Sequence, residues 1–104
     1  MKASLPKTAK RFGKSYASVW SAFQKLGEAC HRAGPLDERT RRLVKIAIAA
    51  AAQSEGSVHS AVRQARSTGI SADEIRHAIL LSITTIGFAR AMAALSWADD
   101  LLTK

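Results

Sequence analysis

Apolar side chains recur at steps of three and four residues through most of this 104-residue chain. Such spacing gathers the side chains on one face of an α-helix, whereas a half-buried β-strand would alternate apolar and polar residues. The sequence therefore predicts an all-α fold, a bundle of five roughly antiparallel helices. The apolar stripes of these helices run through residues 16–33, 43–52, 58–65, 75–86 and 88–102.

Capping residues predict where several of these helices begin. Asp37 is suited to cap the second helix and Ser57 the third, because a short polar side chain can accept a hydrogen bond from a free backbone N–H group. Ser71 and Glu74 have the spacing of a capping box at the start of the fourth helix. The glycines expected to end the third and fourth helices are Gly69 and Gly87.

Basic residues gather at the start of a chain whose formal charge is +8. We expect residues 1–14 to form a flexible basic arm and residues 15–104 to form one helical domain. Such an arm favours binding to nucleic acid or another polyanion. A charged surface that only keeps the domain in solution is the alternative. The basic residues of the arm are Lys2, Lys7, Lys10, Arg11 and Lys14.

Cys30 is the only cysteine, so the chain has no intramolecular disulfide and cannot carry out dithiol redox chemistry alone. We expect Cys30 to be a buried, inert residue on the apolar face of the first helix. No secretory signal or membrane span stands out, and a cytoplasmic location is expected. The spacing of the histidines and Cys30 predicts no metal site, and no cofactor is expected.

The order of these signals resembles the carboxymuconolactone decarboxylase and alkylhydroperoxidase D-like superfamily. Its redox members carry the motif Cys-x-x-Cys-x-x-x-His. A glutamate precedes the first cysteine with eleven residues between them, and a glycine follows the histidine with seven residues between them, just before a capped helix. Counted back from Gly69, these reactive positions hold Arg42, Ser54, Ser57 and Ala61. The resemblance covers about residues 36 to 102. It implies the alkylhydroperoxidase D-like fold and a homo-oligomer. The expected assembly is a trimer or hexamer in which helices from several subunits pack together.

Thiol peroxidase activity is expected to be absent, because a serine hydroxyl has no redox state that could replace the thiol. The hypothesis is a pocket for a small anionic ligand between the second and third helices, lined by Arg42, Ser54, Ser57, His59 and Ala61. Arg42 would pair with the anion. The alternatives are nucleic-acid binding through the arm and a non-catalytic structural subunit.

His59 and Ser57 are the candidate catalytic residues for a decarboxylase-like activity without a redox step. His59 could act as an acid, base or ligand donor. It lies two positions before Ala61, about 200° around the helix, so an exposed or interface histidine is the alternative. Ser57 can be explained by helix capping alone, without a role as nucleophile.

Overall fold

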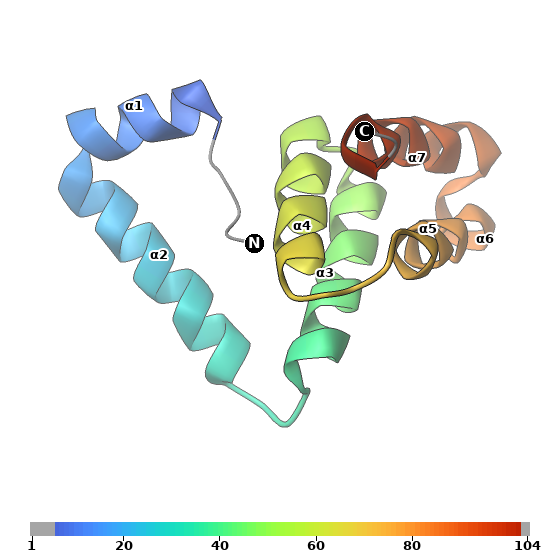
Figure 1. Ribbon diagram of the computed structural model, residues 1–104, viewed down its shortest axis with the longest axis horizontal. Coiled ribbons are helices and arrows are strands. Elements are labelled where there is room, and N and C mark those ends of the chain that lie inside the picture. Colours follow the sequence, from blue (N-terminus) through green and yellow to red (C-terminus); the bar gives the residue numbers. More distant parts are fainter. Residues whose placement is uncertain (1–5, 103–104) are drawn as a thin grey trace. The chain divides into compact units, whose positions relative to one another are not determined.

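The computed structural model describes residues 6–102, which form two compact units, and the chain passes from the first to the second between Leu36 and Asp37. No strand occurs among the described residues, and the predicted all-helical fold is confirmed. None of the helices within residues 6–102 is long and apolar enough to cross a membrane. The helices, labelled in Figure 1, are α1 (Lys7–Ser15), α2 (Ala17–Arg32), α3 (Glu38–Ala52), α4 (Glu55–Ser67), α5 (Ala72–Leu80), α6 (Ile83–Ile86) and α7 (Phe88–Leu102).

The first unit consists of α1 and α2 and has no buried side chain among its described residues. Its two helices are joined through aromatic contacts instead. The ring of Phe12 lies 5.2 Å from that of Tyr16 and 6.2 Å from that of Trp20, and Trp20 stacks on Phe23 at 5.8 Å. These pairs are in the range of favourable aromatic contacts. The unit is therefore held by one aromatic cluster rather than by a core.

Two predictions concern residues of this first unit. Residues 7–14, expected in a flexible arm, lie in helix α1, while residues 1–5 are outside the described part of the chain. The prediction that Cys30 is buried is wrong, because its side chain is exposed. The apolar spacing correctly predicts the helix that carries Cys30, but the first unit has no core of its own in which to bury that face.

The second unit, α3 to α7, contains the hydrophobic core. Helix α4 packs against α3 and α7, and α5 packs against α3 and α7 as well (Figure 1). Small alanines on α3, α4 and α7 allow close approach of the helices, and branched side chains fill the space between them. The core residues are Ile46, Ala49, Ala50, Val58, Val62, Ala65, Ile70, Ile75, Ala78, Ile79, Ala94 and Ala98.

Local hydrogen bonds confirm the predicted starts of two helices. The Asp37 carboxylate accepts a 2.8 Å hydrogen bond from the Thr40 backbone N–H at the start of α3. The capping box of α5 is complete: the Ser71 hydroxyl accepts from the Glu74 N–H, and the Glu74 carboxylate accepts from the Ser71 N–H. Gly69 and Gly87 have positive φ angles of 86° and 91°, and they follow the ends of α4 and α6.

Two predicted boundaries are wrong. Helix α4 is capped by Ser54, one turn before the expected Ser57, because Gln53 takes a left-handed conformation (φ 55°) and reverses the chain immediately after α3. The predicted fourth helix is divided into α5 and α6. At the division, the Ser82 hydroxyl donates a 2.6 Å hydrogen bond to the Ile79 carbonyl, and the Ser82 N–H bonds to the same oxygen.

Candidate functional site

The first turn of α4 presents two serine hydroxyls to each other. The Ser54 hydroxyl donates a 2.9 Å hydrogen bond to the Ser57 oxygen, and it accepts one from the Ser57 backbone N–H at 3.2 Å. The preceding Gln53 amide donates to the backbone carbonyls of Ala50 and Arg90, at 2.9 and 2.8 Å. These hydrogen bonds connect the start of α4 to both α3 and α7, and they hold the two serines in position.

One turn further along α4, His59 meets a carboxylate from α7. Its Nε2 atom lies 3.0 Å from the Oδ2 atom of Asp100, and the imidazole is 24% exposed. Glu55 shares this face of α4, because residues four apart in a helix are neighbours. One donor atom from each of Glu55, His59 and Asp100 lies within 4.8 Å of the others. An imidazole held by a carboxylate has the components for proton transfer.

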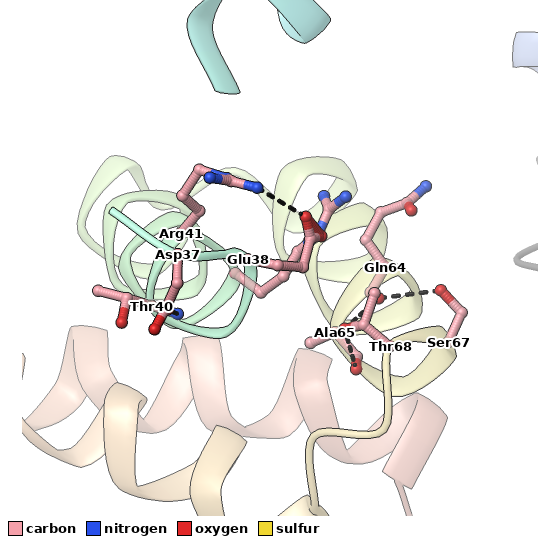
Figure 2. A network of polar contacts seen from close by, with 9 residues as sticks. Asp37, Glu38, Thr40, Arg41, Gln64, Ala65, Ser67 and Thr68 are labelled. Atoms are coloured by element: carbon pink, nitrogen blue, oxygen red, sulfur yellow. Dashed lines mark hydrogen bonds and ion pairs between the residues drawn. The ribbon is translucent and has the colours of Figure 1, made fainter. Parts of the chain in front are cut away.

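Arg42 lies elsewhere on the second unit. Its Nε atom donates a 2.7 Å hydrogen bond to Glu38, and Arg41 donates a 3.1 Å bond to the other oxygen of the same carboxylate. Figure 2 shows the Glu38–Arg41 contact beside the start of α3. From Arg42 to the end of α3 is roughly 15 Å at 1.5 Å per residue. Since α3 and α4 pack together through a two-residue connection, Arg42 lies towards the opposite end of the helix pair from Ser54.

Of the five predicted pocket residues, the structure therefore brings Ser54 and Ser57 into direct contact and places His59 on the next turn of α4. Arg42 is engaged by Glu38. Ala61 is partly buried and packs against the hydrophobic core.

The two arginines also affect the ionisation of Glu38. Hydrogen bonds from Arg42 and then Arg41 hold the pKa of this carboxyl below its ordinary value, against a smaller opposing effect of burial. A carboxylate whose pKa is lower in the folded state stabilises the fold above its unfolded pKa, and this stabilisation is lost as the pH falls through the folded pKa.

We expect Glu38→Gln to lower the free energy of unfolding at pH 7 by up to about 1 kcal/mol, since the carboxylate is partly exposed and the pairs are screened. The difference from the unmodified chain should shrink as the pH falls below the pKa of an unfolded glutamate, about 4.3, and should vanish only below the lowered folded-state pKa, where the Glu38 carboxyl is neutral in both states. Urea unfolding at pH 7 and pH 3 measures it. A difference of equal size at both pH values would contradict the assigned role of the charge.

Comparison with known proteins decides the family of this chain. Residues 18–100 match the Carboxymuconolactone decarboxylase family. The chain belongs to that family. It is also similar to a protein of Paracoccus denitrificans described as "Uncharacterized protein 4 in cox locus", with 29% identity over an alignment 104 positions long that covers 94% of each chain. The resemblance predicted from the glycines and the capping box is confirmed.

Sequence reasoning did not identify Asp100 as a site residue of this carboxymuconolactone decarboxylase family member. The residue follows His59 by 41 positions, so no local spacing connects the two. The only signal is the pair Asp99-Asp100, the two acidic residues of the last helix. Asp99 accepts a 3.0 Å hydrogen bond from Arg76 on α5, while Asp100 contacts His59 on α4. The packing of α7 between α4 and α5 creates both contacts.

Proposed function

We propose that this chain is a non-redox member of the carboxymuconolactone decarboxylase family that binds a small anionic ligand at the start of α4. The observation that carries the proposal is the 2.9 Å contact between the Ser54 and Ser57 hydroxyls. By the family resemblance, these two positions hold the thiols of the redox members. Hydroxyls in their place keep a polar site and remove its redox chemistry.

The remaining cysteine does not restore a dithiol centre. Cys30 lies on α2, in the first unit, and is the sole thiol of the chain. A peroxidase cycle of the two-cysteine type needs a second thiol to resolve the oxidised sulfur. We therefore expect the activity of the chain, where it has one, to be an acid–base reaction of the decarboxylase-like class.

The first turn of α4 suits an anionic group in two respects. Its free backbone N–H groups carry partial positive charge, and the Ser57 hydroxyl, which accepts from Ser54, can donate its own hydrogen bond to a ligand. His59 would then be the group that gives or takes a proton near the ligand. Arg42 is paired with Glu38 towards the other end of α3, so it contributes less to anion binding here than the start of α4 does.

A thermal-shift titration with small carboxylates such as succinate and benzoate tests the proposal. A ligand at one hundred times its dissociation constant should stabilise the fold by about 2.7 kcal/mol. Ser57→Ala removes one hydroxyl while leaving the Ser54 cap in place, and it should reduce this shift. Ser60→Ala, an exposed position of the same helix, is the matched control and should not. No carboxylate-dependent shift, or equal loss in both variants, would contradict the proposal.

A basic face on α1 favours a second candidate function, binding of nucleic acid. Lys7, Lys10, Arg11 and Lys14 are exposed and follow the i, i+3, i+4, i+7 spacing of one helix face. Each phosphate contact contributes about 0.9 to the slope of log affinity against log salt for duplex DNA. Lys10→Glu with Lys14→Glu should therefore reduce this slope by about two in a fluorescence titration. An unchanged slope would show that α1 is not the binding face.

A further inference from the structure

We propose that Glu55, His59 and Asp100 form a site for one divalent transition-metal ion. The proposal does not depend on the small anionic ligand suggested above. Its basis is the convergence of one imidazole nitrogen and two carboxylates from α4 and α7, with all three donor atoms within 4.8 Å of one another. These are the atoms that such ions bind in proteins.

The separation of the donor atoms fits a shared ion. Zinc binds imidazole nitrogen and carboxylate oxygen at about 2.0–2.2 Å, so two neighbouring ligands of one tetrahedral ion lie roughly 3.3–3.6 Å apart. His59 Nε2 and Asp100 Oδ2 are 3.0 Å apart, a hydrogen-bond distance that a small side-chain rotation would open to this separation. Glu55 is exposed and lies one helical turn from His59, so a rotation of its side chain can bring the third oxygen to the same point.

Charge and ligand type indicate which ion would bind. The two carboxylates together balance a divalent cation, which reduces the cost of bringing their charges together. The imidazole favours zinc, cobalt or nickel over magnesium and calcium, which prefer oxygen ligands alone. Three protein ligands leave a coordination position open to water, as in catalytic rather than structural zinc sites. Asp100 is 55% exposed, so an ion can enter from solvent.

Glu55 distinguishes this site from a simple ion pair. The contact between His59 and Asp100 could serve only to hold α4 against α7, and such a contact has no need of Glu55. A metal ion, in contrast, gains its third protein ligand from Glu55. Substitution of Glu55 therefore affects metal binding while leaving the contact between the two helices intact.

Isothermal titration of the chelator-treated full chain with Zn²⁺, in buffer free of carboxylates, tests the site. We expect one ion per chain. Loss of a partner that only orients a ligand already costs about 10- to 100-fold in affinity. Each of Glu55→Gln, His59→Ala and Asp100→Asn should therefore weaken binding at least about ten-fold. Circular dichroism should show that the Glu55→Gln chain remains folded.

His77→Ala is the matched control, since His77 is an exposed histidine on α5. Zn²⁺ affinity should be unchanged in this variant. The proposal would be overturned by the absence of one-to-one binding, by unchanged affinity in Glu55→Gln, or by an equal loss in His77→Ala and His59→Ala. Because no carboxylate ligand is present, the result is independent of the thermal-shift test of the anion site.

Discussion

Replacing Ile79 with alanine should lower the free energy of unfolding by roughly 2–5 kcal/mol. The side chain is fully buried on α5, where it belongs to the same core cluster as Ile46 of α3 and Ala94 of α7. Truncation removes apolar contacts and leaves a cavity that neighbouring helices fill only in part. Since a small domain has a total stability of about 5–15 kcal/mol, this one substitution should remove a large share of it. Urea unfolding gives the value directly.

Ile48→Ala is the matched control for this prediction, with the same chemical change on a side chain that is 61% exposed. At low protein concentration it should change the free energy by about 0.5 kcal/mol or less. Equal costs at the two positions would contradict the assignment of the core. A cost at Ile48 that grows with protein concentration would indicate that this face of α3 lies in an interface between copies.

The double substitution Ser54→Cys with Ser57→Cys should create a dithiol that closes into a disulfide under mild oxidation. The two hydroxyl oxygens are 2.9 Å apart, and a helix N-terminus stabilises a thiolate at this position. In a Cys30→Ser background, titration with a thiol reagent should find two thiols per chain before oxidation and none after it. The expected effect is complete conversion rather than a graded change.

Ser54→Cys with Ser60→Cys serves as the control for the disulfide. Six residues along a helix correspond to about 600° of rotation, so these side chains point in different directions and should keep both thiols. Survival of both thiols in the Ser54–Ser57 pair would contradict the described geometry. Even with its thiols reduced, the double variant should turn over peroxide slowly, because Arg42 and Ala61 stand where the resemblance implies a glutamate and a histidine that relay the proton.

The features predicted correctly from the sequence are those decided within one helical turn. Asp37 and Ser71 cap their helices because each hydroxyl or carboxylate reaches a backbone N–H group three residues ahead. Ser54 and Ser57 are both good capping residues, and the choice between them depends on the left-handed turn at Gln53. That turn is also tied to the Arg90 carbonyl on α7, a contact with no local signal.

Features that depend on distant packing were not predicted. The partner of His59 comes from α7, and the exposure of Cys30 follows from a first unit that has no core of its own. The face of α2 that carries Cys30 also carries the exposed side chains Val19, Phe23 and Leu26. The homo-oligomer expected from the sequence remains a prediction, and burial of these side chains against another copy is the physical reason to expect it.

Peroxide consumption by the unmodified chain tests the central proposal, that this family member has no redox centre. Purified protein is supplied with hydrogen peroxide and dithiothreitol, and peroxide is followed over time. We predict a rate equal to that of the Cys30→Ser variant and of dithiothreitol alone, since serines replace both reactive thiols. Repeated turnover of peroxide by the unmodified chain, above both controls, would contradict the proposal.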